Sequence, residues 1–385
     1  MKPVYLDYAA STPVRKEVIE EMNKAFEVFG NPSSVHQEGQ KAKELVDKAR
    51  ETVAKILNCM PDEIIFTSGA TEAINLAIKG VMRANKHKGN HIVTTKIEHS
   101  AVLNACKSLE KDNVKTTLVD VKPDGIVHTN DVRAAINDKT VLVSVMYANN
   151  EIGTIQPISE IGSICKAKKL HFLVDASAAG LLDLDVKKLG CDMLALDGSK
   201  IYGPKGIGIL FLKHGILLEP QINGGGQQFG VRSGTENVAG IVGFARALQL
   251  LQEEKKEESA RLEKLRNKLI TQLLLKIPES TINGNRQERL PNNVNISILG
   301  VEGKTIVNHL DHFGIAVSTG SACGSKSDEP SHVLLALGLN YKRCNGSLRI
   351  TLGKYTTDKD VTYLIQMLPQ IVESLWKATG KELKS

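Results

Sequence analysis

The sequence lacks several features that would assign it to a specialised class of protein. Its longest apolar runs, such as residues 140–146 (TVLVSVM), have strand length and fall far below the roughly 20 residues that a helix needs to span a bilayer. The first residues, MKPVYLDYAASTP, become acidic and polar too early for a secretory signal. We therefore expect a cytoplasmic protein with no membrane segment.

An excess of charge of one sign is also missing. The 385 residues carry a net charge of +6, from 49 basic and 43 acidic side chains. Basic residues are interspersed with acidic ones, as in residues 252–268 (QEEKKEESARLEKLRNK), which is the pattern of a solvated helix face rather than of a nucleic-acid surface. We expect no direct binding to nucleic acid.

Cysteine is sparse, and none of the six residues belongs to a CxxC pair, so neither a zinc site nor a redox dithiol is expected. Five lie in apolar patterns and are expected to be small buried residues: Cys59, Cys106, Cys165, Cys191 and Cys344. Cys323 differs, because it lies among small and polar residues in the stretch 318–330 (STGSACGSKSDEP). A thiol in such a segment is expected to be exposed and mobile, as a nucleophile requires.

The sequence does contain a regular alternation of helical and strand patterns over its first half. We predict helices at residues 49–57, 70–85, 101–111 and 159–169, and strands at residues 62–69, 91–97, 115–121, 141–150, 171–177, 191–199 and 206–212. This alternation is typical of an α/β fold, in which helices cover a mainly parallel sheet and ligands bind at the carboxyl ends of its strands.

The second half of the chain is organised differently. A helical segment over residues 238–277 leads away from the alternating region, and the remainder has the pattern of a compact α+β unit. Because 385 residues are too many for one simple core, we expect two domains. The large domain is placed at residues 15–255, and the small domain, with the Cys323 segment, at residues 1–14 and 256–385.

Polar clusters follow five of the predicted strands at the point where each strand ends. They are SGATE, EHS, ANNE, DAS and DGSK. Ordinary surface turns are polar as well, but five such ends at one edge of a parallel sheet favour a binding site.

A nucleotide is not that ligand. The stretch 197–210 (DGSKIYGPKGIGIL) spaces its glycines as a P-loop does, but Pro204 stands where the lysine should follow the second glycine. Proline lacks the backbone donor that a phosphate cradle would use, so we reject the P-loop interpretation. No GxGxxG motif opens a helix after a strand, so a dinucleotide site is not expected either.

Pyridoxal 5'-phosphate (PLP) suits the same residues better. A helix that starts at Ala70 and Thr71 directly after a strand offers N–H groups to an anion, although a threonine there can also serve helix stability alone. Asp175 ends an apolar strand, and a buried carboxylate needs a cationic partner such as a protonated pyridine nitrogen. Lys200 at a strand end offers the amine that the aldehyde needs, whereas Lys205 lies in a turn.

A set of stretches then carries a resemblance to a known family: LDYAASTP, FGNPSSVH, FTSGATEAINLAIKG, IEHSAVL, ANNEIGTIQP, VDAS, SKIYGPKGIG, GGGQQFGVRSGTEN, STGSACGSK and SLRITLGKYTT. In this order and over essentially the whole chain, they resemble the cysteine desulfurases of the IscS/NifS type. Those enzymes are PLP-dependent transferases of fold type I in the class V aminotransferase group. The resemblance therefore implies their fold, a mainly parallel sheet covered by helices with a smaller α+β domain.

The resemblance also implies a role for each cofactor contact. Lys200 would carry PLP and shuttle protons, Asp175 would pair with the pyridine nitrogen, and His99 would stack on the ring and assist proton transfer. A lone histidine such as His99 would otherwise be an ordinary core or surface residue. The further contacts implied are Ala70, Thr71, Asn150, Ser177, Asp197, Ser199 and, from the other subunit of a homodimer, Thr235.

The implied substrate is L-cysteine, contacted by Asn150 and clamped through its carboxylate by Arg349, whose guanidinium fork suits that task. Cys323 would attack the substrate sulfur, keep it as a persulfide and leave L-alanine. The long segment around Cys323 resembles the branch that delivers sulfur to iron–sulfur scaffold proteins and to tRNA-thiolation partners. Cys323 is also a candidate ligand for a metal cluster on such a partner, and no metal is expected in the chain itself.

The chain departs from the family pattern in two places. The family usually reads D-A-x-Q-x-x-G, whereas DASAAG at residues 175–180 is one residue shorter and lacks the glutamine, which leaves Ser177 as the replacement donor. The family usually reads S-x-H-K before the lysine, whereas this chain has Asp197-Gly198-Ser199-Lys200. Ser199 can donate to a phosphate, but an ionised Asp197 repels one. We therefore expect PLP binding that is weakened.

Two other classes of function stay open. Another class V enzyme, such as an aminotransferase or a lyase, would have no use for a thiol in the Cys323 segment. A degenerate paralogue that only binds partners would explain the two departures but not the presence of Lys200 and Cys323 together. An L-cysteine desulfurase therefore accounts for most of the residues.

Overall fold

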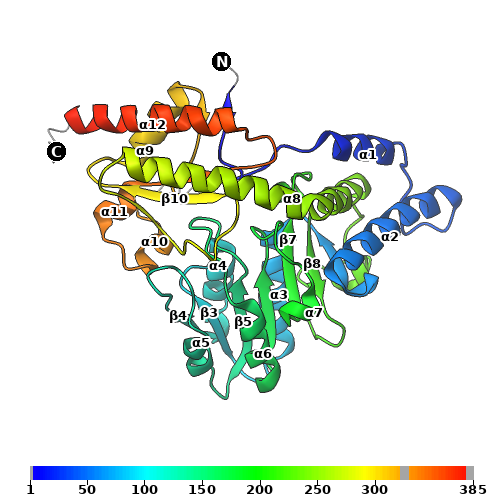
Figure 1. The fold of residues 1–385 in the computed structure, drawn as a ribbon. Coiled ribbons are helices and arrows are strands. Elements are labelled where there is room, and N and C mark those ends of the chain that lie inside the picture. Colours follow the sequence, from blue (N-terminus) through cyan, green and yellow to red (C-terminus); the bar gives the residue numbers. More distant parts are fainter. Residues whose placement is uncertain (1–2, 321–328, 379–385) are drawn as a thin grey trace.

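The computed structural model describes residues 3–320 and 329–378, and its larger part is an α/β layer structure (Figure 1). A seven-stranded sheet has the order β2-β8-β7-β6-β5-β3-β4. Its strands are β2 (Ile64–Thr67), β3 (His91–Thr95), β4 (Lys115–Val119), β5 (Thr140–Met146), β6 (His171–Asp175), β7 (Met193–Asp197) and β8 (Gly208–Leu212). Strand β8 is antiparallel to both of its neighbours, and every other adjacent pair is parallel. The expected mainly parallel sheet is confirmed.

Helices cover both faces of this sheet, because its strands are apolar on both sides. In β6, Phe172 and Val174 belong to one hydrophobic core and Leu173 to the other, as the two-residue period of a strand requires. The first core packs the sheet against α2 (Gln37–Leu57), α6 (Ile158–Lys168) and α7 (Val186–Leu189). The second core packs it against α3 (Ala70–Ala84) and α4 (Ser100–Ser108). The short helix α5 (Thr129–Ala135) lies beside α6 and β4.

The smaller part is built on an antiparallel sheet of β9 (Ser280–Ile282), β10 (Asn293–Ile298) and β12 (Ser347–Thr351), in the order β12-β10-β9. The start of the chain joins it, because β1 (Val4–Tyr5) pairs in parallel with β11 (Ile315–Ala316). Its helices are α9 (Gly303–His312), α10 (His332–Ala336), α11 (Tyr341–Asn345) and α12 (Asp358–Ala378). These elements agree with the α+β unit that the sequence predicts.

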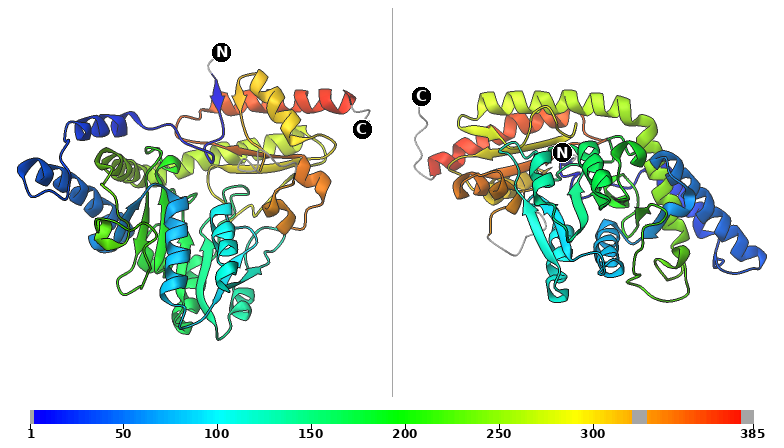
Figure 2. Two further views of the ribbon diagram at one scale, coloured as in Figure 1. Left: turned by 180° about the vertical axis from the view of Figure 1, so that it is seen from behind. Right: turned by 90° about the horizontal axis from the view of Figure 1, so that it is seen from below.

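One long helix, α8 (Val238–Lys276), connects the two parts, and the view from below shows how far it runs (Figure 2, right). Its first half places Phe244 and Leu248 in the core of the large sheet. Its second half places Leu262 and Leu269 in the core of the small part. The helix expected at residues 238–277 is therefore confirmed, and it contributes to both cores.

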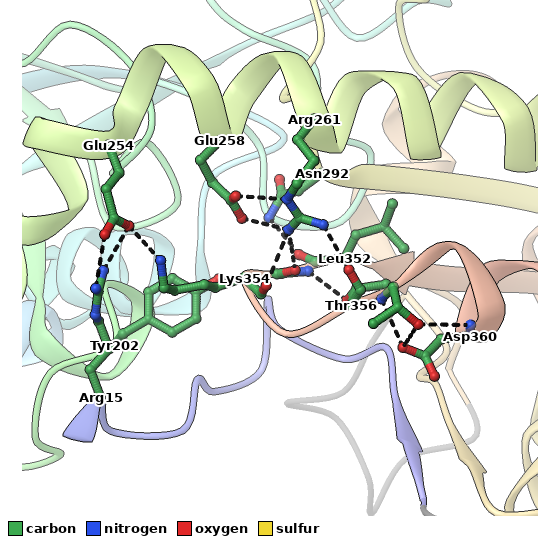
Figure 3. A network of polar contacts seen from close by, with 12 residues as sticks. Arg15, Tyr202, Glu254, Glu258, Arg261, Asn292, Leu352, Lys354, Thr356 and Asp360 are labelled. Atoms are coloured by element: carbon green, nitrogen blue, oxygen red, sulfur yellow. Dashed lines mark hydrogen bonds and ion pairs between the residues drawn. The ribbon is translucent and has the colours of Figure 1, made fainter.

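Polar side chains also join distant segments where α8 passes the N-terminal segment and the loop after β12 (Figure 3). Arg15 donates through Nη1 and Nη2 to the carboxylate of Glu254, at 2.8 and 2.9 Å. Lys354 Nζ donates to the same carboxylate at 2.6 Å. We call Arg15, Glu254 and Lys354 the clasp.

Three expectations need correction. The helix expected at residues 49–57 begins at Gln37, and α1 (Lys16–Phe26) was not expected at all. Both stretches are rich in charged residues, so their narrow apolar faces are hard to see without the core that they cover. Cys59 is half-buried rather than buried. Among the described residues, no helix has the length and apolar character to cross a bilayer.

Candidate active site

A cavity of about 410 Å³ lies where the parallel strands of the large sheet end. All five polar strand ends contribute to its lining. The sequence-predicted residues around it are Ala70, Thr71, His99, Asn150, Asp175, Ser177, Asp197, Ser199, Lys200 and Arg349. The first nine follow or end strands of the large sheet, and the last lies on β12 of the small part. The cavity therefore lies between the two parts of the chain.

Lys200 reaches the cavity from a short 3₁₀ turn that follows β7. Its Nζ donates to the backbone oxygen of Ala10, which lines the same cavity. Lys205 lies in the next turn and donates instead to the oxygen of Thr12 at 3.2 Å. Of the two candidate lysines, Lys200 is the one that lines the cavity.

Asp175 is the last residue of β6 and is 5% exposed. Its Oδ1 accepts from the backbone N–H of Ser177 at 2.9 Å and from the Ser177 hydroxyl at 2.5 Å. Within the described part of the chain, Oδ2 has no hydrogen bond. The carboxylate of this aspartate, which lines the cavity, can accept from a cationic ring nitrogen. The Ser177 hydroxyl is engaged with Asp175, so it serves to hold this carboxylate.

His99 is the N-cap of α4 and also lines the cavity. Its Nδ1 accepts from the backbone N–H of Ala101 at 3.1 Å, so a neutral ring carries its proton on Nε2. Behind it, the fully buried Glu98 accepts from the Thr95 hydroxyl at 2.7 Å and from the N–H of Met146 at 3.1 Å. Burial raises the pKa of Glu98 to about 8.

Arg349 brings a buried guanidinium to the opposite wall. The residue is 2% exposed, and its Nη2 donates to Asp7 at 2.9 Å. Its Nε is buried and has no hydrogen-bond partner in the part of the chain that the structure describes. A buried donor without a partner is costly, and a bidentate carboxylate is the ligand that would satisfy it.

Asn150 lies in a turn whose shape is fixed by its neighbours. The side chain of Asn149 accepts from the N–H groups of Glu151 and Ile152, at 2.8 and 2.9 Å. Glu151 accepts from the Ser331 hydroxyl at 2.5 Å, and burial raises the pKa of its carboxyl to about 7. This turn therefore joins the cavity wall to the residues that precede α10.

The start of α3 forms the remaining wall. Gly69 precedes the helix with φ of 155° and ψ of 174°, a backbone region open essentially to glycine alone. The N–H of Ala70 donates to Asp197 Oδ2 at 3.0 Å. Asp197 Oδ1 in turn accepts from the N–H and the hydroxyl of Ser199, at 2.9 and 2.6 Å. A carboxylate of the chain itself thus lies on the first N–H of this helix.

Comparison with known proteins agrees with this arrangement. The class-V aminotransferase family profile matches residues 4–364. The chain is 50% identical over 376 residues to the cysteine desulfurase IscS of Clostridium botulinum, covering 97% of this chain and 95% of that one. Among solved structures, a NifS-like protein matches with a TM-score of 0.91 and 39% identity, covering 97% and 100% of the two chains. A second, described as SspA in complex with cysteine, matches with a TM-score of 0.80 and 36% identity, covering 92% and 100%.

The chain belongs to the IscS/NifS family of cysteine desulfurases. This family lies within the class-V aminotransferases, so the expected fold type I architecture is confirmed.

Thr235, a predicted cofactor contact, is not among the described residues that line the cavity. Thr235 is exposed, in the segment between β8 and α8. Cys323 falls in residues 321–328, outside the described residues. On either side of that stretch, Ser331 donates to Glu151, and a Cβ added to Gly320 would lie 2.7 Å from Glu151 Oε2.

The cavity of this desulfurase family member fits the ring of the family's cofactor. Lys200 offers the amine, Asp175 offers a carboxylate, and His99 lines the same cavity from the N-cap of α4. At the other end, a phosphate would meet the helix start at Ala70, where Asp197 already lies. The donors for a phosphate are therefore present, but a carboxylate shares them.

Some lining residues were missed by the sequence analysis. Tyr8, Asn292 and Thr351 line the cavity, and Asp7 holds Arg349. Asp7 and Tyr8 lie in the motif LDYAASTP, which is part of the family resemblance. The motif could therefore have marked them as site residues, although the sequence predicts no role for either. Glu98 and Glu151 stand in the motifs IEHSAVL and ANNEIGTIQP in the same way, but their burial depends on the packing of strands β3 and β5, which the sequence alone does not show.

Proposed function

We propose that this protein is a PLP-dependent desulfurase that takes the sulfur of L-cysteine, keeps it as a persulfide on Cys323 and releases L-alanine. The observation that carries the proposal is the single cavity around Lys200, Asp175 and the unpartnered Nε of Arg349. An amine, an anion and a carboxylate clamp are what an amino acid and PLP require together. Relatives described as cysteine desulfurases, and the neighbour described as being in complex with cysteine, support this substrate.

Each residue has one task in this scheme. Asp175 pairs with the pyridine nitrogen, and Ser177 keeps its carboxylate in place. Arg349 and Asn150 orient the substrate, with the Arg349 Nε toward its carboxylate. PLP, when bound, supplies an electron sink that weakens bonds at the substrate's α-carbon. Ala70, Thr71, Ser199 and Asp197, which line the cavity, would hold the phosphate, and His99 would contact the ring.

The sulfur atom passes from the substrate to Cys323. The Cys323 thiolate forms a sulfur–sulfur bond as the carbon–sulfur bond of the substrate breaks. The electron pair of the broken bond stays with the substrate carbon, which takes up a proton. Lys200 is the proton carrier, because its amine lies at the cavity and becomes available during turnover.

We further propose that the working unit is a homodimer in which Thr235 from the second copy completes the phosphate site. Thr235 is exposed in the single chain. Large apolar side chains on the arm formed by α1 and α2 are exposed as well: Phe26 at 67%, Phe29 at 83% and Val35 at 93%. Exposed apolar surface of this kind marks an interface. The arm projects to one side of the molecule, where a second copy can reach it (Figures 1 and 2).

The partition at residues 15–255 and 1–14 with 256–385 stays our proposal for the two domains. It is supported by the separate cores of the two parts. We place the protein in the cytoplasm, since all five cysteines in the described residues are free thiols, as a reducing compartment favours. The proposed acceptors of the persulfide sulfur are iron–sulfur scaffold proteins and tRNA-thiolation partners.

Incubation of the purified protein with L-cysteine and PLP tests the proposal. We expect sulfide and alanine to be released, and Cys323→Ser to lower the rate at least about 100-fold, because the nucleophile itself is lost. Cys59→Ser is the matched control: burial raises the pKa of this half-buried thiol to about 12, so its loss should leave the rate unchanged.

Three results would contradict the proposal in different ways. Sulfide release that survives Cys323→Ser would show another nucleophile. Keto-acid formation without sulfide would indicate a different class V enzyme. Failure to bind PLP at all would indicate a protein that only binds partners.

A further inference from the structure

The start of α3 already holds an anion. The N-terminus of a helix attracts negative charge because its first N–H groups have no partner within the helix and its dipole is positive there. In this chain Asp197 Oδ2 accepts from the first of these groups, Ala70 N–H, at 3.0 Å. Ala70 and Asp197 are 127 residues apart in sequence, so the contact is made by the fold and not by a local turn.

The carboxylate of Asp197 is held in this position by several contacts. Its other oxygen accepts from both the N–H and the hydroxyl of Ser199. The backbone leaves room for it: a Cβ on Gly69 would lie 3.1 Å from Asp197 Oδ2. A Cβ on Gly208, which pairs with Asp197 in the sheet, would lie 2.7 Å from Gly69. The two glycines let β2, β7 and β8 approach closely enough for the carboxylate to meet the helix.

No cation offsets this carboxylate within the described residues. Arg232, the arginine near the start of α3, is engaged with Glu72 at 2.8 Å. Lys200 and Lys205 donate to the oxygens of Ala10 and Thr12. Asp197 forms no ion pair with any described lysine, arginine or histidine. The Ser199 hydroxyl, which could donate to a phosphate, donates to Asp197 instead.

We propose that Asp197 determines vitamer specificity: it occupies the anion position at the start of α3 and thereby weakens the binding of the phosphorylated cofactor selectively. This inference rests on the proposed function, since it takes PLP as the cofactor. A phosphate monoester carries a charge of about −1.5 to −2 near neutral pH, and it repels a carboxylate at close range in a half-buried site. The pyridoxal ring, held by Lys200 and Asp175, does not meet this repulsion.

Titration of the full-length apoprotein with PLP and, separately, with pyridoxal tests the proposal by binding alone. The dissociation constant is followed by the visible absorbance of the lysine-bound vitamer, so turnover is not needed. Asp197→Asn keeps the shape and removes the charge, and Asp197→Ser replaces the carboxylate with a hydroxyl donor. For both variants we expect PLP to bind at least about tenfold more tightly and pyridoxal to change by less than about twofold, because only the phosphate meets residue 197.

Glu72→Gln is the matched control. Glu72 is also an acidic residue in the first turn of α3, but it accepts from the Ser68 N–H at 2.8 Å and pairs with Arg232, away from the cavity lining. A general effect of charge on the helix would change PLP binding in Glu72→Gln as well. We expect this variant to bind both vitamers as the wild type does.

The wild type alone provides a second measurement that needs no variant. We expect its preference for PLP over pyridoxal to stay below about tenfold, because the Asp197 carboxylate already occupies the position that the phosphate needs. A much larger preference, or equal PLP binding by wild type and both Asp197 variants, would overturn the inference and leave the proposed function intact. Failure of every form to bind either vitamer would overturn both.

Discussion

At the scale of single residues, Glu98 has a strongly raised pKa and lies beside the site. Its carboxyl is fully buried behind His99, and its Oε2 has no hydrogen-bond partner among the described residues. Burial disfavours the charged form and raises the pKa to about 8, so the folded protein holds this proton at a pH where the unfolded chain has lost it. Glu98 is therefore neutral when the protein is folded at neutral pH.

This difference predicts a pH dependence of stability. Between the ordinary value of 4.5 and about 8, the folded state binds more protons, so the free energy of unfolding should fall with rising pH. One such group contributes a slope of at most about 1.4 kcal/mol per pH unit. Glu98→Gln should flatten the slope in urea unfolding curves measured across this window. A slope that Glu98→Gln leaves unaltered would contradict this pKa for Glu98. Burial also raises the pKa of the Glu151 carboxyl to about 7, and Glu151→Gln measures how much that residue adds to the slope.

At the scale of elements, α8 couples the two cores. Phe244 is fully buried in the core of the large sheet, and Leu269 is fully buried in the core of the small part. Truncation of either side chain to alanine should lower the free energy of unfolding by about 3–4 kcal/mol, because each leaves a cavity. If α8 couples the cores, each variant should still unfold in a single transition.

Leu275 is the control for this prediction, since it lies on the same helix and is 75% exposed. Leu275→Ala should change the free energy of unfolding by less than about 0.5 kcal/mol. Two separate transitions in Phe244→Ala or Leu269→Ala, seen by circular dichroism and fluorescence together, would show that the cores are independent.

At the scale of the whole molecule, the clasp of Arg15, Glu254 and Lys354 links three segments that are distant in sequence (Figure 3). The Arg15 side chain is 3% exposed and that of Glu254 is 35% exposed. The hydrogen bond from Arg15 is the main cause that lowers the pKa of Glu254 to about 2. The carboxylate therefore stabilises the fold above its ordinary value of 4.5, and this stability is lost as the pH falls toward about 2.

Glu254→Gln should lower the free energy of unfolding at neutral pH by about 1–2 kcal/mol, a value at the low end for a charged hydrogen bond because the site is partly exposed. The variant should also lose less stability than the wild type on acidification below about pH 4.5. Glu253→Gln is the neighbouring control, since Glu253 is exposed and, among the residues that the structure describes, accepts a hydrogen bond only from Gln249. Equal stability of both variants would show that the clasp contributes nothing to the fold.

Much of the architecture was predictable at the scale of elements. Strand β6 and helix α3 carry patterns that repeat every two or every three to four residues, and such patterns are readable within a short window. Helix α1 was missed because five of its eleven residues are charged, which leaves only a narrow apolar face. The start of α2 was missed for the same reason.

The sequence by itself determined the elements, the family and the residue types at the ends of the strands. Only the tertiary structure decided which of these residues touch. The order β2-β8-β7 brings Ala70 and Asp197 together across β8, and the bridge between Asp7 and Thr351 of β12 brings Asp7 to Arg349, 342 residues away. Local patterns are encoded over a few residues, whereas such contacts depend on strand order and on the burial of whole faces. For that reason the sequence could show that Asp197 departs from the family pattern, while its contact with the first N–H group of α3 is visible only in the fold.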